Sequence, residues 1–257
     1  MLAFTAKGER HMDYSRYKNI LVERKDRILR LILNRPESLN AVTPAMHAEL
    51  ATLFADVRRD SDADVVILTG AGRGFCAGAD LKEPPPDKKT AERIFEEARD
   101  IIVNILEVDK PIISAVNGPA AGLGATLALF PDIVVMSDRA KIGDTHVKVG
   151  LAAGDGGAVI WPILVGVNKA KELLMTGQVI DAQEALRIGL VNHVVPHEKL
   201  DEFVTEMAQR LASGNTFAIR CTKKAVNQYV KWMLNQVFDY SLALEYQCGL
   251  RLFPQTD

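Results

Sequence analysis

The spacing of apolar residues divides the chain into strand-like and helix-like stretches. Short apolar runs predict strands at residues 20–23, 28–33, 64–69, 111–116 and 132–136. Apolar residues at helical spacing predict helices at residues 43–57, 94–106, 122–129, 158–164, 169–175 and 182–188. Strands and helices therefore alternate up to about residue 195, which is typical of an α/β fold.

The last part of the chain has a purely helical pattern. From Lys199 to Phe253 the spacing predicts helices almost throughout, in three segments separated near Gly214 and Tyr229. The chain is therefore expected to have three parts: a disordered lead-in at 1–12, an α/β core at 13–198 and a C-terminal helical subdomain at 199–257.

Composition and charge narrow the class of protein. The chain has 257 residues, of which 48% are hydrophobic and 25% are charged, as in ordinary globular proteins. The formal net charge is −2 and like charges do not cluster, which argues against a nucleic-acid partner or a polybasic membrane anchor. No apolar stretch reaches the ~18 residues that span a bilayer, and residues 1–12 lack the apolar segment of a secretory signal.

Cysteine and histidine spacing predicts neither disulfides nor a metal site. The three cysteines, at positions 76, 221 and 248, are odd in number and widely spaced, which favours reduced thiols and a cytoplasmic location. The five histidines, at positions 11, 47, 146, 193 and 197, do not have the spacing of metal ligands.

Common nucleotide and hydrolase motifs are absent from the sequence. The stretch after residue 65 begins like a dinucleotide-binding turn, but Phe75 stands where its third glycine is needed. The chain has no P-loop, no G-x-S-x-G elbow and no H-E-x-x-H pair. Nucleotide hydrolysis, serine hydrolysis and zinc chemistry are therefore not favoured.

Two glycine-rich segments that follow apolar strands carry the main functional signal. They are RGFCAGADL at residues 73–81 and AVNGPAAGLGA at residues 115–125. Backbone N–H groups become available where a strand ends and a helix begins, and small residues let a ligand approach them. For either segment alone, a tight turn is the simpler interpretation. The ordered pair predicts an oxyanion hole, in which each donor contributes roughly 3–4 kcal/mol.

These segments resemble the two signature motifs of the crotonase (enoyl-CoA hydratase/isomerase) superfamily. The resemblance extends from about Tyr17 to Phe253 and includes Leu39-Asn40-Ala41, Asp132-Ile133 and the stretch 177–195. It implies a ClpP-like spiral of ββα units, with residues 199–257 as a helical trimerisation subdomain. It also implies a homotrimer or a dimer of trimers. The expected substrate is an acyl-CoA thioester, with coenzyme A as part of the substrate and no separate cofactor.

The resemblance also implies roles for individual residues. The oxyanion donors fall on the backbone N–H groups of Ala79 and Leu123. The positions expected to bind coenzyme A are Ala41, Ala77, Asp80 and Leu81. The carbonyl groups near the first two of these are expected to meet the adenine ring.

The chain departs from an ordinary hydratase at the two main catalytic positions. The resemblance implies a glutamate at each, and this chain has Thr126 and His146. A threonine hydroxyl is not a base near neutral pH, so Thr126 is expected to orient substrate or water. A histidine is a competent acid or base, and such catalysis contributes about 10²–10⁴-fold in rate.

Asp155 lies in a Gly-Asp-Gly segment just before a predicted helix. It either caps that helix or orients His146 and stabilises its charged form, as in a triad. Direct action as a base or nucleophile is a further alternative.

His47 and Glu245 are additional candidates. On helical spacing alone, His47 is a boundary histidine and Glu245 a surface glutamate. Together with His146 and Asp155, however, they resemble the acid/base set of the β-diketone hydrolase branch of this superfamily, typified by 6-oxocamphor hydrolase. That branch has a further histidine at the position of Leu123 and lacks the intact 77–80 motif.

The sequence therefore predicts an acyl-CoA enzyme that stabilises a thioester enolate. A hydratase-like lyase is the main hypothesis, in which His146, oriented by Asp155, transfers the proton. A C–C bond hydrolase of a β-diketone and a non-catalytic acyl-CoA binder remain as alternatives.

Overall fold

The computed structural model of the chain describes residues 2–4, 10–84 and 87–252. The elements, in chain order, are β1 (Leu2–Phe4), β2 (Arg10–Met12), β3 (Ile20–Lys25), β4 (Ile28–Leu33), η1 (Pro36–Ser38), α1 (Pro44–Arg59), β5 (Val65–Gly70), α2 (Lys88–Glu107), β6 (Ile112–Val116), β7 (Ala120–Ala121), α3 (Leu123–Leu129), β8 (Ile133–Ser137), β9 (Lys141–Gly143), η2 (His146–Val149), α4 (Gly157–Val165), α5 (Val167–Thr176), β10 (Ile180–Asp181), α6 (Ala182–Arg187), β11 (His193–Val195), η3 (His197–Lys199), α7 (Leu200–Ser213) and α8 (Thr216–Leu252).

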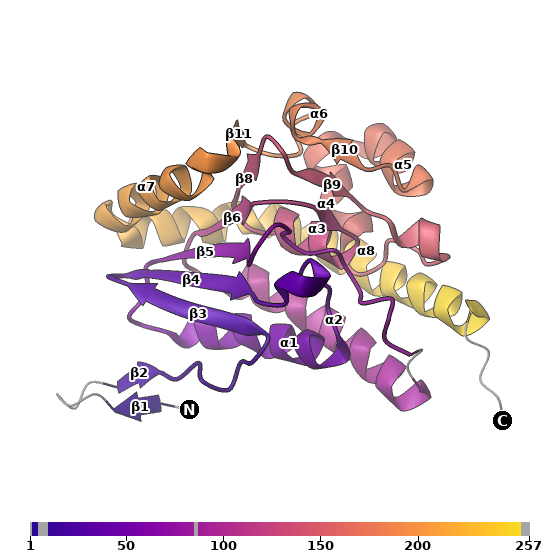
Figure 1. Cartoon of the computed structure of the whole chain (residues 1–257), viewed down its shortest axis with the longest axis horizontal. Helices are drawn as coiled ribbons and strands as arrows, with labels where there is room; N and C mark the ends of the chain where they lie inside the picture. The colour runs from indigo at the N-terminus through magenta and orange to yellow at the C-terminus, as the bar shows by residue number, and fades with distance from the viewer. Residues whose placement is uncertain (1, 5–9, 85–86, 253–257) are drawn as a thin grey trace.

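A six-stranded sheet runs through the centre of the fold (Figure 1), in the order β11-β8-β6-β5-β4-β3. All neighbouring strands are parallel except β3 and β4, which form a hairpin that turns at Asp26. Strands β5 and β6 are almost fully buried, as expected for continuous apolar runs in a parallel sheet. The predicted α/β architecture is therefore confirmed.

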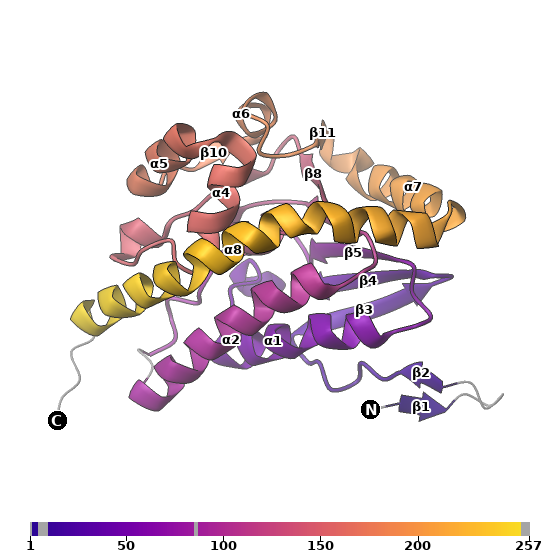
Figure 2. The ribbon, with the colours of Figure 1, turned by 180° about the vertical axis from the view of Figure 1, so that it is seen from behind.

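Helices cover both faces of this sheet. Successive side chains of a strand point to opposite faces. Val66 and Leu68 of β5 accordingly join the main core with α1 and α2, whereas Val65 and Ile67 pack against Val204 of α7. Figure 2 shows α8 crossing the molecule from α7 past α2 toward α4, and α8 contacts all three helices.

A smaller three-stranded sheet, β10-β9-β7, lies beside the main one. Strand β7 belongs to the second glycine-rich segment and pairs in parallel with β9. Two isolated bridges, Cys76 with Ala120 and Val42 with Ala79, join the first glycine-rich segment to β7 and to the start of α1. These pairings hold the two glycine-rich segments together and tie the first of them to the start of α1.

The C-terminal helical region differs from the prediction in one respect. The break near Gly214 is confirmed, because α7 ends at Ser213 and α8 begins at Thr216. The break near Tyr229 is wrong, since α8 continues to Leu252. Glycine and proline are absent from residues 216–248, and tyrosine does not interrupt a helix.

Six of the residues in the predicted lead-in form secondary structure. Leu2–Phe4 pair antiparallel with Arg10–Met12. Residues 1 and 5–9 lie outside the described residues. The boundaries of the lead-in, core and C-terminal subdomain stay predictions.

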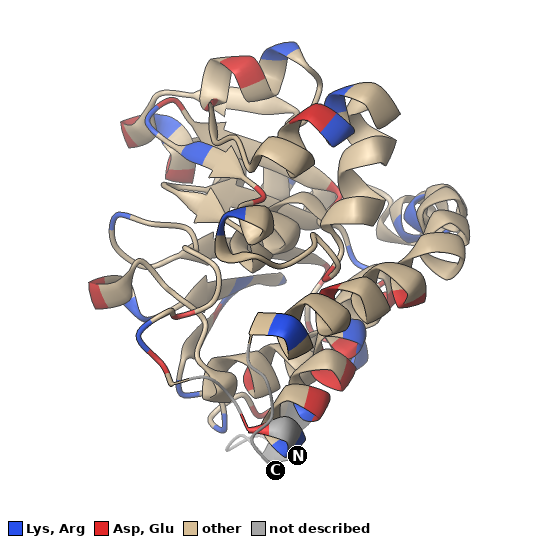
Figure 3. Cartoon of the chain, turned by 90° about the vertical axis from the view of Figure 1, so that its right-hand side faces the viewer, with Lys and Arg blue, Asp and Glu red and all other residues tan. Residues whose placement is uncertain are grey.

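Charged residues of both signs are interspersed over the outer elements in Figure 3, in keeping with the net charge of −2. Within the ranges that the structure describes, no helix combines the length and apolar character needed to cross a membrane.

Candidate active site

The two glycine-rich segments lie directly against each other. The Ala121 N–H donates to the Cys76 carbonyl over 3.0 Å. Gly78 has φ +86°, and a Cβ atom there would lie only 2.7 Å from the Ala121 carbonyl oxygen. Glycine is therefore required at position 78 by both its backbone conformation and the closeness of the second segment.

The N–H group of Ala79 takes no part in the β-bridge between Ala79 and Val42. The Val42 N–H donates to the Gly78 carbonyl over 2.8 Å, and the Asp80 N–H donates to the Val42 carbonyl over 3.0 Å. In a parallel bridge of this kind, the N–H of the middle residue points away from its partner. The Ala79 N–H thus faces away from Val42 and is available to a ligand.

Leu123 is the first residue of α3, where N–H groups have no partner within the helix. The preceding residue, Gly122, has φ +52°, and its own N–H donates to the Gly143 carbonyl over 3.1 Å. This bond fixes the turn that presents the Leu123 N–H. The role of Ala79 and Leu123 as oxyanion donors stays a prediction.

The ring of His146 lies beside this same turn. A Cβ atom at Gly122 would lie 3.6 Å from Cε1 and 3.7 Å from Nε2 of His146. His146 begins η2, and its N–H donates to Asp144 over 3.2 Å. A group that can carry a proton therefore stands next to the Leu123 N–H.

Carboxylates surround both ring nitrogens of His146. Nδ1 lies 2.7 Å from Oδ1 of Asp144, and Nε2 lies 3.3 Å from Oδ2 of Asp155 and 4.0 Å from Oε1 of Glu245. Only the imidazolium form can donate from both nitrogens at once. The geometry therefore favours a charged His146 whose orientation is fixed by Asp144 and whose second nitrogen faces Asp155.

The electrostatics of this cluster agree with that geometry. Burial alone lowers the pKa of His146, but the Asp155 charge and the hydrogen bond to Asp144 outweigh burial and raise it well above its usual value. Burial raises the pKa of Asp155, but the charge and hydrogen bond of His146 outweigh burial and lower it. At neutral pH the pair is thus an imidazolium and a carboxylate.

The pKa of Glu245 is shifted in the opposite direction from that of Asp155. Its side chain is buried, and this burial, with the charge of Asp155, raises its pKa to about 8. Its Oε2 atom has no hydrogen-bond partner among the described residues. The interpretation of Glu245 as a surface glutamate is wrong, because α8 places it against Gly154 in the Gly-Asp-Gly segment.

Thr126 contacts Asp155 directly. Its hydroxyl is fully buried on α3 and donates to Oδ1 of Asp155 over 3.0 Å. Thr126 therefore orients a carboxylate, where the sequence predicted that it orients substrate or water. The interpretation of Asp155 as a helix cap is wrong, because Gly156 precedes α4 at the cap position and no side chain caps this helix.

His47 lies in the first part of α1. Its side chain is buried, and Nδ1 lies 2.8 Å from Oε2 of Glu97 on α2. The boundary interpretation of His47 is therefore wrong, because a helix far along the chain covers its position.

Two of the four residues expected to bind coenzyme A contact Arg35. The Arg35 guanidinium donates to the Ala41 carbonyl and, over 2.9 Å, to Oδ2 of Asp80, which lowers the pKa of Asp80. The Ala77 N–H donates to the Leu39 carbonyl over 3.0 Å. Leu81 is 76% exposed. The binding roles of these positions stay predictions.

One group of described residues has the composition of a metal site. Ligand atoms of Asp144, His146 and Asp155 lie within 4.8 Å of one another. A histidine with two carboxylates is a donor set that divalent cations accept. Here both ring nitrogens already face carboxylates, so the imidazolium balances their charge and the arrangement fits proton transfer better than metal binding.

Sequence reasoning missed three residues of this region. Asp144 lies two residues before His146, and this closeness in the sequence was the available signal. Arg35 and Glu97 gave no signal, because their partners are distant in the sequence and meet them only in the fold.

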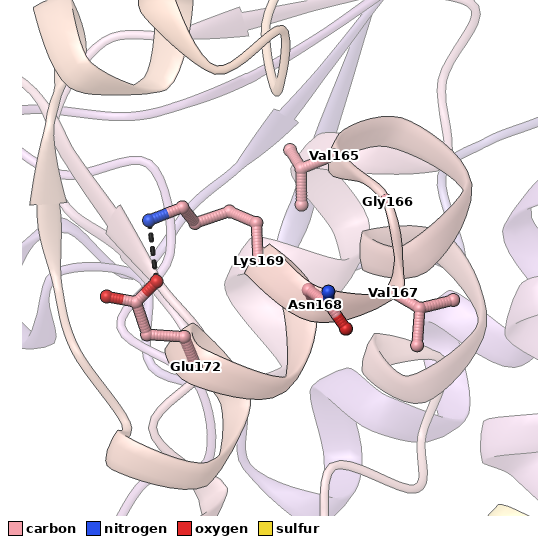
Figure 4. A pocket seen from close by; sticks show the side chains of 6 residues that line it. All are labelled: Val165, Gly166, Val167, Asn168, Lys169 and Glu172. Carbon is pink, nitrogen blue, oxygen red and sulfur yellow. Dashed lines mark hydrogen bonds and ion pairs between the residues drawn. The ribbon is translucent and has the colours of Figure 1, made fainter.

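A separate hollow lies between α4 and α5 and holds none of the predicted site residues (Figure 4). Its cation, Lys169, is paired with Glu172 over 2.6 Å, which leaves no free charge for a ligand. The hollow is lined by Val165, Gly166, Val167, Asn168, Lys169 and Glu172.

Comparison with known proteins decides the family. Residues 23–249 match a family model described as enoyl-CoA hydratase/isomerase. The chain belongs to this family. The resemblance to the crotonase superfamily and the predicted fold are therefore confirmed, and the chain is an enzyme of the enoyl-CoA hydratase/isomerase family.

Three relatives illustrate the range of this family. The chain is 38% identical over 208 residues to an (E)-benzylidenesuccinyl-CoA hydratase of Thauera aromatica, covering 80% of this chain and 81% of the relative. An enoyl-CoA hydratase/isomerase structure from Mycobacterium paratuberculosis superposes with a TM-score of 0.88 at 34% identity, covering 92% and 96%. A β-diketone hydrolase from the cyanobacterium Anabaena sp. PCC 7120, bound to (S)-3-oxocyclohexyl acetic acid, superposes with a TM-score of 0.87 at 32% identity, covering 93% and 97%.

Proposed function

We propose that this enzyme binds an acyl-CoA thioester and adds water across its α,β double bond. The observation that carries this proposal is the cluster of His146, Asp155 and Glu245 beside the turn that presents the Leu123 N–H. The cluster supplies an acid and a base near an oxyanion site, which is what hydration of a conjugated thioester requires.

The thioester carbonyl is bound by the N–H groups of Ala79 and Leu123. When water adds to the β-carbon, negative charge develops on the thioester oxygen as an enolate. Backbone donors that are already oriented stabilise this charge without rearrangement. The contact between the two glycine-rich segments supports this assignment, because it fixes both turns relative to each other.

Proton transfer is divided between two side chains. The ionised form of Glu245 takes a proton from water, whose oxygen bonds to the β-carbon, and His146 gives its Nε2 proton to the α-carbon. The proton then passes from Glu245 to His146, whose facing atoms are 4.0 Å apart, and the enzyme is restored. Asp155 stabilises the imidazolium, and Thr126 holds Asp155.

A β-diketone hydrolase is the second candidate. The similarity to the Anabaena enzyme favours it, since its TM-score nearly equals that of the enoyl-CoA hydratase/isomerase structure. In such a reaction, water attacks one carbonyl carbon, a C–C bond breaks, and the released carbon receives a proton. Leu123, where that branch has a histidine, and the intact 77–80 motif favour the thioester instead.

The test combines isothermal titration with acetyl-CoA and crotonyl-CoA and the loss of crotonyl-CoA absorbance in the same samples. Binding with loss of the enoyl band supports hydration, and His146→Ala is then expected to abolish turnover. Binding without turnover would reject hydration of this substrate and favour an acyl-CoA binder. Failure to bind either thioester, with hydrolysis of a cyclic 1,3-diketone, would establish the second candidate.

We also propose a homotrimer or dimer of trimers in the cytoplasm, with coenzyme A entering only as part of the substrate. Large apolar side chains on α8 support assembly, since Phe217 is 77%, Tyr229 79% and Trp232 64% exposed in the single chain.

A further inference from the structure

His47 and Glu97 form a largely buried, hydrogen-bonded pair between α1 and α2. Nδ1 of His47 lies 2.8 Å from Oε2 of Glu97, and their side chains are only 8% and 13% exposed. The other carboxylate oxygen of Glu97, Oε1, lies 3.3 Å from Nε of Arg93, one turn earlier on α2. Glu97 is thus held from two sides, by a guanidinium near the surface and an imidazole inside.

This pair lies close to the turn that contains Ala79. Thr43 caps α1 by accepting from the Met46 N–H over 3.2 Å, and Val42 just before it is bridged to Ala79. The His47 N–H donates to the Thr43 carbonyl over 2.9 Å. His47 therefore lies about one helical turn from the segment that pairs with Ala79.

The hydrogen bond to Glu97 determines which nitrogen of His47 is available. A carboxylate at Nδ1 keeps the proton on that nitrogen, as in a catalytic triad. Nε2, on the far side of the ring from Glu97, makes no hydrogen bond to any residue in the described part of the chain. It is therefore the ring nitrogen that is left for a hydrogen bond to another group.

We propose that Glu97 is a positioning residue of the active site, which fixes His47 so that Nε2 hydrogen-bonds the water that adds to the acyl group. The inference rests on the proposed hydration and extends it. Glu97 does not touch the substrate, and its effect is transmitted entirely through His47.

A double-mutant cycle tests this transmission. The variants are Glu97→Gln, His47→Gln and the two combined, with kcat and KM measured for crotonyl-CoA hydration. Glu97→Gln keeps the size of the side chain but removes its charge, so kcat is expected to fall about 10-fold with little change in KM. In the His47→Gln background, the same change is expected to have less than about a 2-fold effect, because the two residues act as a unit.

The neighbouring residue Glu96 provides the matched control. It is exposed on the same helix, and Glu96→Gln makes the same chemical change away from His47. This variant is expected to keep the wild-type kcat. An equal loss of kcat from Glu97→Gln in the presence and absence of His47 would overturn the inference, because that result indicates a purely structural role.

Nitrogen NMR of the His47 ring provides a readout that does not depend on turnover. The wild-type ring is expected to carry its proton on Nδ1, and Glu97→Gln is expected to move a measurable share of it to Nε2. An unchanged ring spectrum would overturn the inference. If crotonyl-CoA is not hydrated by the wild type, the proposed function fails, and the NMR result still decides the role of Glu97.

Discussion

At the scale of single residues, burial and charge divide the acid and base roles among side chains of similar chemistry. Asp155 and Glu245 are both buried carboxyl groups near His146, yet the pKa of Asp155 is lowered and that of Glu245 is raised to about 8. The difference arises because Asp155 lies 3.3 Å from Nε2 and accepts from Thr126, whereas Glu245 is 4.0 Å away. Groups whose pKa values are pushed apart in this way are suited to distinct steps of one reaction.

The ionisation of Glu245 predicts how the rate depends on pH. The base form exists only above its pKa of about 8, so kcat/KM for crotonyl-CoA is expected to rise as the pH increases from 6 to 9. Glu245→Gln is expected to lose this rise and to lower kcat by about 10²-fold. A rate that falls over the same pH range would show instead that Glu245 acts as the acid.

The same carboxyl group predicts how stability depends on pH. Its folded-state pKa of about 8 lies above the usual 4.5, so the folded protein binds the proton more tightly. The stabilisation is complete below pH 4.5 and is lost as the pH rises through 8. In urea unfolding, the stability of the wild type relative to Glu245→Gln is expected to fall by on the order of 1 kcal/mol per pH unit between pH 5 and 8. If the free energy of unfolding depends on pH in the same way for the wild type and Glu245→Gln, the raised pKa of Glu245 is contradicted.

At the scale of elements, short turns between strands and helices carry the backbone groups that we propose to bind the thioester. Gly78 and Gly122 have positive φ angles, and they hold the two glycine-rich segments in contact. The Leu123 N–H is available because it opens α3, so a change at this one position can remove the donor without breaking the helix.

Replacing Leu123 by proline tests this donor. Proline is tolerated at the first position of a helix but has no N–H. Leu123→Ala is the matched control, since it also loses the buried side chain but keeps the N–H group. Turnover of crotonyl-CoA by Leu123→Pro is expected to be about 10²–10³-fold below that of Leu123→Ala. Equal turnover in the two variants, with both folded by circular dichroism, would remove Leu123 from the oxyanion hole.

Local sequence was sufficient to predict most helices and strands and the segments around the candidate site. The cap and proline at the start of α1 and the apolar runs of β5 and β6 are local signals, and the structure contains these elements. The contacts between side chains within the candidate site could not be predicted in this way, because they join residues that are far apart in the sequence. Glu97 contacts His47 over 50 positions, and Glu245 reaches the site because α8 crosses the molecule, so helical spacing alone assigned both His47 and Glu245 incorrectly.

At the scale of the whole molecule, exposed apolar side chains on α8 predict assembly. Light scattering after size-exclusion chromatography is expected to give three or six chain masses. Trp232→Asp is expected to shift the population toward single chains, because it places a charge in an apolar contact. A wild-type protein of one chain mass would reject the trimer.

The uninterrupted course of α8 joins two parts of the protein that a break near Tyr229 would have separated. Trp232 on the outer surface of α8 and Glu245 beside His146 belong to one continuous helix. Removing this helix would therefore take away the proposed base together with the proposed assembly surface. A chain shortened before α8 is accordingly not a smaller version of the enzyme, since it would lack Glu245, the side chain proposed as the base.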